Sequence, residues 1–303
     1  MHAWHGMARA VPPDRFAAGA RIGDYRVDYE VAIEATAVVY LATHVVLPRK
    51  AHIKVTHPGS RTSAIQLLRE ACILEALSHP GYPGHPGHPG IPRVHECGVL
   101  ADRRPWCAIE VIDGATFKQL TGDGPVALSD LVVVLRDIAD ILQHAHEHGI
   151  VHRRLITSSI VQLQRRRNSY AISDWSDART LDSAADGVVD PGNDVHALGV
   201  IAFRALTGKL PEPLVSAATY CPAAPTELIS LIDQMLAEPG ERPTATEVFE
   251  RAARLCHTLE VAPRPERARW TPPQGYVPDG VSAGSLEDNR GGFAIRISRI
   301  RTS

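Results

Sequence analysis

Histidine side chains gather in two segments, where their imidazole nitrogens could bind a metal ion. Residues 79–90 are four His-Pro-Gly triplets with one change, and they supply His79, His85 and His88. The second group comprises His144, His146, His148 and His152. No cysteine or carboxylate completes a ligand set at the second group, and proline excludes a helix from the repeat. We interpret the repeat as an expanded surface loop, with a metal-binding tract as the alternative.

Alternating apolar side chains predict a sheet in the first third of the chain. Residues 25–55 alternate apolar with polar positions and are rich in Val and Tyr, which favours antiparallel strands. Further strand signals lie at residues 92–97 and 106–112. Between them, the apolar side chains of residues 62–78 recur at helical spacing, which predicts one helix beside the sheet.

The remainder of the chain shows mainly helical spacing. One helix is expected from Ser129, as its N-cap, to Gly149, as its stop. Three later helices are expected at 194–207, 225–236 and 244–256. Strands first and helices afterwards predict an α+β fold with segregated classes.

Composition places the chain among soluble globular proteins. Of its 303 residues, 44% are hydrophobic and 22% charged, and the net charge of −2 gives no overall field that favours nucleic acid or a membrane surface. Five cysteines without C-x-x-C spacing predict reduced thiols in a cytoplasmic protein. The N-terminus lacks the apolar core of a signal peptide, and the apolar runs are too short to span a bilayer.

Four short motifs are spread over both halves of the chain. Residues 51–54 read A-H-I-K, residues 149–153 read G-I-V-H-R, residues 173–176 read S-D-W-S and residues 241–244 read E-R-P-T. In this order they are similar to the V-A-I-K strand, the approach to the catalytic loop, the D-F-G position and the closing arginine motif of protein kinases. Residues 25–256 therefore resemble a bacterial-type, eukaryotic-like Ser/Thr protein kinase domain.

The resemblance implies a bilobal, protein-kinase-like fold. A small antiparallel β lobe with one helix is expected over residues 23–110, with the His-Pro-Gly loop inside it, and a larger helical lobe over 111–258. Mostly disordered tails are expected at 1–22 and 259–303, where Pro, Gly and charged residues show little periodicity.

The resemblance also implies where a nucleotide would bind. Lys54 would pair with the phosphates and with Glu70, Ile109 would be the gatekeeper beside the hinge, and Asp174 would be the metal ligand. The full set of nucleotide-binding candidates is Lys54, Glu70, Ile109, Glu110, Val111 and Asp174.

The loop that should close over the phosphates has lost its glycines. The G-x-G-x-x-G positions carry Ala32, Glu34 and Ala37. Only glycine lets backbone N–H groups approach the phosphates closely, and the Glu34 carboxylate would repel a polyphosphate.

The catalytic loop has lost its chemistry. Residues 152–159 read H-R-R-L-I-T-S-S, so that Arg154 replaces the Asp base and Ser159 the metal-binding Asn, although His152 and Arg153 remain. A guanidinium cannot accept a proton at neutral pH. Arg154 is expected either to pair with Asp174 or to face solvent, and Asp177 is the one nearby acidic side chain that could replace the base.

The segment after Asp174 is short. Only residues 175–193 separate Asp174 from Asp194, Trp175 and Ser176 replace the Phe and Gly of D-F-G, and no A-P-E motif follows. The sequence therefore predicts that the platform for a protein substrate is missing.

These departures indicate a pseudokinase, a catalytically inactive module that binds other signalling proteins, such as an active kinase or its substrates. Two alternatives remain: a nucleotide sensor, and a weakly active atypical kinase that uses ATP with or without Mg²⁺. In the pseudokinase interpretation, Lys54 and Glu70 persist as a stabilising ion pair and Asp174 caps a turn.

Overall fold

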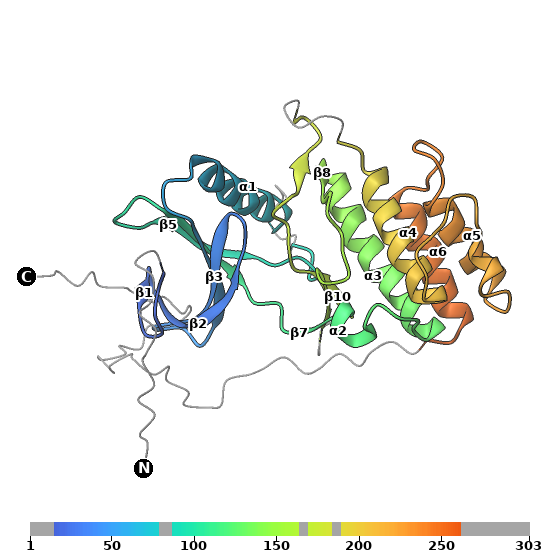
Figure 1. The fold of residues 1–303 in the computed structure, drawn as a ribbon, viewed down its shortest axis with the longest axis horizontal. Coiled ribbons are helices and arrows are strands. Elements are labelled where there is room, and N and C mark those ends of the chain that lie inside the picture. Colours follow the sequence, from blue (N-terminus) through green and yellow to red (C-terminus); the bar gives the residue numbers. More distant parts are fainter. Residues whose placement is uncertain (1–14, 79–86, 164–168, 184–188, 262–303) are drawn as a thin grey trace, which may run out of the picture.

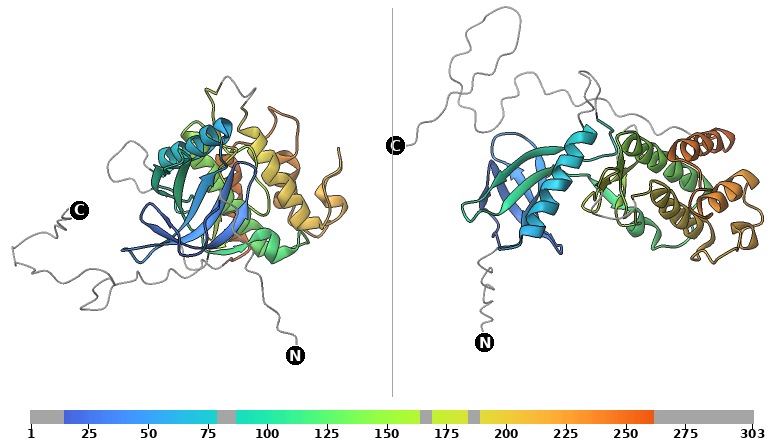
Figure 2. Two further views of the ribbon diagram at one scale, coloured as in Figure 1. Left: turned by 60° about the vertical axis from the view of Figure 1, so that its left-hand side comes forward. Right: turned by 90° about the horizontal axis from the view of Figure 1, so that it is seen from above.

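A sheet-rich lobe and a helical lobe lie side by side along the long axis of the molecule (Figures 1 and 2). The computed structural model describes residues 15–78, 87–163, 169–183 and 189–261. The α+β arrangement expected from the sequence is confirmed, with the strands of the main sheet and one helix within residues 21–110 and the other long helices after them.

The small lobe is a six-stranded sheet in the order β1-β2-β3-β4-β6-β5, antiparallel throughout. Its strands are β1 (Arg21–Ile22), β2 (Tyr25–Ile33), β3 (Ala37–His44), β4 (Lys50–Thr56), β5 (Val94–Val99) and β6 (Pro105–Glu110). The strand expected at 106–112 therefore ends two residues early, at Glu110. Helix α1 (Arg61–Ser78) passes across the sheet, where the helical spacing predicted it.

The two faces of this sheet bury different groups, because neighbouring side chains on a strand point to opposite sides. One face forms a separate apolar cluster that includes Tyr40, Ile53 and Trp106. The other face packs against α1 and contributes Cys107 and Ile109 to the main core, which continues into the helical lobe. Every second side chain of β4 therefore lies on the face of the sheet that packs against α1.

The chain joins the small lobe earlier than expected. The tail predicted to be disordered through residue 22 instead has Phe16 against the outer sheet face, with its backbone N–H donating to Tyr40 Oη at 3.2 Å and its ring edge-on to Tyr40. Arg15 pairs with Glu30, and β1 pairs with β2. The ring of Phe16 packs on the apolar cluster of this sheet face, and this burial stabilises the short segment. Residues 1–14, most of the His-Pro-Gly loop (79–86) and residues 262–303 lie outside the described residues.

The helical lobe is organised around α3 (Leu128–Glu147), which packs against α4 (Gly192–Thr207) and α6 (Ala245–Thr258). Its other elements are β7 (Gly114–Thr116), α2 (Phe117–Thr121), β8 (Ile150–Val151), β9 (Ile160–Leu163), β10 (Tyr170–Ile172), β11 (Arg179–Thr180), a 3₁₀ turn (Ala217–Thr219) and α5 (Thr226–Met235). None of the helices in the described part of the chain is both long and apolar enough to cross a bilayer.

The start of α3 differs from the expectation. Ala127, not Ser129, is the N-cap, and it makes no side-chain cap hydrogen bond. Ser129 lies inside the first turn because Leu128 enters the helix and packs on the core. At α6, by contrast, Thr244 and Glu247 form a complete capping box, which fixes the helix start where the pattern predicts it.

A buried carboxylate ties α3 to the β9–β10 hairpin. Asp137 Oδ2 accepts hydrogen bonds from the backbone N–H groups of Ser169 (2.6 Å) and Tyr170 (3.1 Å), and Oδ1 accepts two from Arg136. Because Asp137 is only 3% exposed, each of its lone pairs needs a protein partner.

We predict that Asp137→Asn lowers the free energy of unfolding by about 3 kcal/mol, because the amide NH₂ would face donors and Arg136 would lose its anion. Chemical denaturation of both proteins measures this. Asp130→Asn, an exposed change in the first turn of the same helix, is the matched control and should cost about 0.5 kcal/mol. Equal losses in the two variants would contradict the role given to Asp137.

Candidate nucleotide cleft

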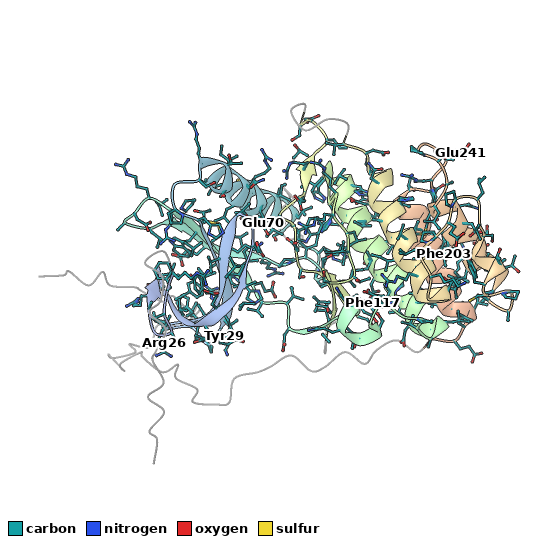
Figure 3. All side chains as sticks on the ribbon, in the orientation of Figure 1. Arg26, Tyr29, Glu70, Phe117, Phe203 and Glu241 are labelled. Atoms are coloured by element: carbon teal, nitrogen blue, oxygen red, sulfur yellow. The ribbon has the colours of Figure 1, made fainter. Side chains whose placement is uncertain are left out.

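A lysine on β4 and a glutamate on α1 form a buried ion pair between the sheet and the helix. Lys54 Nζ donates to both carboxylate oxygens of Glu70, at 2.9 and 3.0 Å. The two residues are 7% and 4% exposed, and Glu70 lies where α1 passes over the sheet (Figure 3). The structure therefore brings together the two residues that the sequence paired.

A second carboxylate reaches the same lysine from the altered glycine-rich loop. Glu34 Oε2 lies 3.5 Å from Lys54 Nζ. The loop is held in this position because the Glu34 N–H donates to Ala37 O (2.8 Å) and His57 Nε2 donates to Glu34 O (2.9 Å). Glu34, which stands at a glycine position of the motif, thus brings its negative charge next to Lys54, the cation expected to bind phosphate.

The charges in this cluster shift one another's proton affinity. Burial acts to lower the pKa of Lys54, but Glu70, Glu34 and Asp174 outweigh it and raise that pKa above its usual value. Burial also raises the pKa of Glu70, although Lys54 opposes the shift. Burial acts to raise the pKa of Asp174, and Lys54 together with the hydrogen bonds from Ser176 reverses this and holds the pKa below its usual range. Lys54 is therefore permanently cationic and surrounded by acidic groups.

The arginine at the base position pairs with a neighbour outside the cleft. Arg154 Nη1 donates to Asp177 Oδ2 at 2.9 Å, with both side chains largely in solvent. The hypothesis that Arg154 fills the metal site by pairing with Asp174 is therefore wrong, and its solvent-facing alternative is closer to the structure. The same contact occupies Asp177, the side chain considered as a replacement base.

The remainder of the catalytic loop is anchored from α4. Asp194, 1% exposed, accepts hydrogen bonds from the backbone N–H groups of His152 (2.8 Å) and Arg153 (2.7 Å) and from His146 Nε2 (3.0 Å). These contacts hold Arg153 at a φ of 70°, a conformation that a non-glycine residue rarely adopts. The loop thus keeps its backbone geometry although its chemical side chains have changed.

Of the two metal positions, only Asp174 keeps a carboxylate. Ser159 is 3% exposed, and its hydroxyl donates to Ile156 O (2.8 Å) and accepts from the Ile156 N–H. Asp174 Oδ1 accepts from the Ser176 N–H at 3.1 Å, which closes a turn. Asp174 could hold a Mg²⁺ ion only together with water and the phosphates of a nucleotide, because Ser159 is turned to the backbone of its own loop.

No group of three or more His, Cys, Asp or Glu side chains in the described part of the chain is arranged to hold a metal ion. His88, the histidine of the repeat that the structure describes, instead contacts Asp140 at 3.1 Å. His144 Nε2 donates to Leu77 O at 3.0 Å. His79 and His85 lie outside the described residues.

The tryptophan that replaces the phenylalanine of D-F-G is locked in place. Trp175 is fully buried, its Nε1 donates to Ile172 O at 3.0 Å, and its ring meets the His152 ring edge-on at 4.9 Å. His152 Nε2 also donates to Asp174 O at 2.6 Å. These contacts fix Trp175 against the catalytic loop and β10.

The hinge-side candidates lie apart from the lysine cluster. A hollow of about 640 Å³ is lined in part by Tyr29, Leu41, His52, Glu110, Val111 and Asp113, and Lys54 and Asp174 are not among its lining residues. Ile109 is buried in the core. His52 was not identified from the sequence, although it lies two residues before Lys54 and so on the same strand face. Burial lowers the pKa of His52, and the positive charge of Lys54 lowers it further.

We predict that Lys54→Met lowers the free energy of unfolding by about 3 kcal/mol, because it strands buried carboxylates without a cation. Glu70→Gln should cost less, roughly 1–2 kcal/mol, because Glu34 and Asp174 still neutralise Lys54. Denaturant titrations of the two variants test this order. A larger loss in Glu70→Gln than in Lys54→Met would contradict the three-carboxylate cluster.

The pH dependence of Lys54→Met gives a second check. Without the cation, mutual repulsion and burial raise the carboxyl pKa values above those of the unfolded chain, so the folded state binds more protons. Stability then falls as pH rises, and the deficit relative to the unsubstituted protein should shrink as the pH is lowered from about 7 to about 5. A deficit that grows on acidification would show that the three carboxylates do not share Lys54.

The chain is similar in sequence to bacterial protein kinases, although no family model matches it. It is 29% identical over 220 residues to the serine/threonine-protein kinase Pkn1 of Myxococcus xanthus, covering 64% of this chain and 30% of that protein. It is 25% identical over 218 residues to the serine/threonine-protein kinase PrkC of Bacillus subtilis, covering 64% and 32%. The match thus spans about a third of the length of these curated relatives.

The fold is that of solved kinase domains. The structure superposes on the PknI kinase domain of Mycobacterium tuberculosis with a TM-score of 0.62 and 22% identity, over 79% of this chain and 99% of that one. This likeness confirms the expected bilobal fold, with a curled antiparallel sheet next to a helical lobe. The chain therefore contains a protein-kinase-like domain.

Proposed function

We propose that this kinase-like domain is a pseudokinase that binds signalling proteins without transferring phosphate. The observation that carries the proposal is the Arg154–Asp177 ion pair, at 2.9 Å, in the position where a kinase needs a proton acceptor. Arg154 cannot accept the proton of a substrate hydroxyl, and Asp177 is engaged by the guanidinium. Neither side chain of the pair can therefore act as the general base.

The state of Lys54 supports the same conclusion. A nucleotide phosphate would have to displace Glu34 from Lys54 and then lie beside Glu34, Glu70 and Asp174. Like charges at such distances in a partly buried site oppose binding. The carboxylates thus neutralise internally the charge that would otherwise attract a polyphosphate.

The ordered frame of the loops supports a role in protein binding. Hydrogen bonds to Asp194 and from Trp175 hold the loops in place without the Asp and Asn side chains that phosphoryl transfer uses. The outward side of α1 presents Ile65 and Leu68, which are 49% and 45% exposed. We propose an active kinase or its substrates as the class of partner.

We predict that millimolar ATP, with or without Mg²⁺, leaves the melting temperature of the protein unchanged and raises that of Glu34→Gln. Ligand that binds only the native state must raise the melting temperature, so even weak occupancy is visible. Removing the Glu34 charge frees Lys54 for a phosphate. Glu30→Gln is the matched control, because Glu30 lies on β2, four residues before Glu34, and pairs with Arg15 instead of Lys54.

An ATP-dependent shift in the unsubstituted protein that disappears in Lys54→Met would overturn the closed cleft and favour the nucleotide sensor. An equal change in melting temperature with ATP in Glu34→Gln and in Glu30→Gln would show that Glu34 does not exclude the nucleotide.

A further inference from the structure

Two cysteines stand directly opposite each other on neighbouring strands of the small lobe. The antiparallel register of β5 and β6 pairs Cys97 with Cys107, and their Sγ atoms are 2.9 Å apart. Directly opposed residues of an antiparallel pair have Cα atoms about 4.5–5.5 Å apart, which lies within the range that a disulfide bridges. The two thiols therefore already have the backbone geometry of a cross-strand disulfide.

The two thiols differ in exposure and in proton affinity. Cys97 is exposed, whereas Cys107 is fully buried. The contact with Cys107 lowers the pKa of the Cys97 thiol, although burial opposes the shift. The same contact raises the pKa of Cys107, and its burial adds to that. Because the thiolate is the nucleophile, an oxidant from solvent meets the more reactive of the two sulfurs first.

We propose that Cys97 and Cys107 form an oxidisable dithiol, which a peroxide converts to a disulfide across β5 and β6. In the first step the Cys97 thiolate attacks a peroxide oxygen and becomes a sulfenic acid, and the cleaved oxygen leaves as water after taking up a proton. In the second step Cys107 attacks the sulfenic sulfur, the S–S bond forms and a second water leaves. Two thiols lose two electrons in total, and one peroxide is reduced.

The position of the pair connects it to the candidate cleft. On the other side of β6, Cys107 is paired in register with Lys54 of β4, and α1 packs over β4, β5 and β6. A disulfide between β5 and β6 restricts the relative motion of these two strands, and β6 pairs with β4, the strand that carries Lys54. The oxidation state of the dithiol thus sets the rigidity of the sheet beside the Lys54–Glu70 ion pair.

The test is to treat the purified full-length protein with hydrogen peroxide, alkylate the remaining thiols and map the peptides by mass spectrometry. The expected product has lost about 2 Da and contains one disulfide, between Cys97 and Cys107. Cys72, which is also exposed but lies on α1, is the internal control and should stay available for alkylation after mild treatment. When the protein is first unfolded in urea, the register is lost, so Cys97 should no longer be oxidised in preference to Cys72.

Two variants separate this pair from general thiol oxidation. In Cys107→Ser the sulfenic acid of Cys97 has no resolving thiol and should be trapped by dimedone, whereas the unsubstituted protein should give little adduct. Cys97→Ser, a change at an exposed position, should abolish the disulfide and leave Cys107 unmodified even if Cys107→Ser folds poorly. The proposal is overturned if the folded, unsubstituted protein accumulates the dimedone adduct at Cys97 while Cys107 remains a free thiol, or if Cys97 joins another cysteine.

Discussion

The ammonium group of Lys54 is the point on which the small lobe depends. It joins the central strand β4 to α1 through Glu70, to the loop between β2 and β3 through Glu34, and it holds the pKa of Asp174 low from the other lobe. Burying the Lys54 cation is tolerable because the carboxylates of Glu70 and Glu34 lie 2.9 and 3.5 Å from it. The arrangement of sheet, helix and loop around Lys54 therefore follows from electrostatic necessity as much as from apolar packing.

This constraint explains how a kinase-like fold can persist with an altered cleft. In such a fold the phosphates of a nucleotide supply the negative charge beside the lysine. Here the side chain of Glu34 supplies it from within the chain, at the position where a glycine would leave room for the ligand. The backbone of the catalytic loop is held because Asp194 accepts hydrogen bonds from His152 and Arg153, and Trp175 is fully buried in the main core. The loop that carries Arg154 is therefore ordered.

Periodicity and motif order were enough to predict the lobes, most of the strands and helices, and the Lys54–Glu70 pair. Local features with weak sequence signals were missed. The N-cap of α3 moved to Ala127 because core packing at Leu128 outweighed the capping preference of Ser129. Packing of Phe16 against Tyr40 likewise ordered residues expected in the tail.

Contacts that depend on register or on loop geometry could not be read from one sequence. The choice of Arg154 between Asp174 and Asp177 is decided by the turn after Asp174. Cys97 and Cys107 lie opposite each other only because β5 pairs with β6 in this register. The two cysteines are ten residues apart in the chain and form no C-x-x-C motif. His52 could have been found, because a period of two places it beside Lys54 on the strand.

The most direct test of the central claim is a phosphoryl-transfer assay with γ-labelled ATP, in Mg²⁺ and in Mn²⁺, on the purified protein and on Lys54→Met. The label would be followed both into the protein itself and into a general protein substrate. We expect the same background incorporation in both proteins, because Arg154 stands at the position of the base and pairs with Asp177. Metal-dependent incorporation by the unsubstituted protein that is lost in a folded Lys54→Met variant would show that the domain is an active kinase.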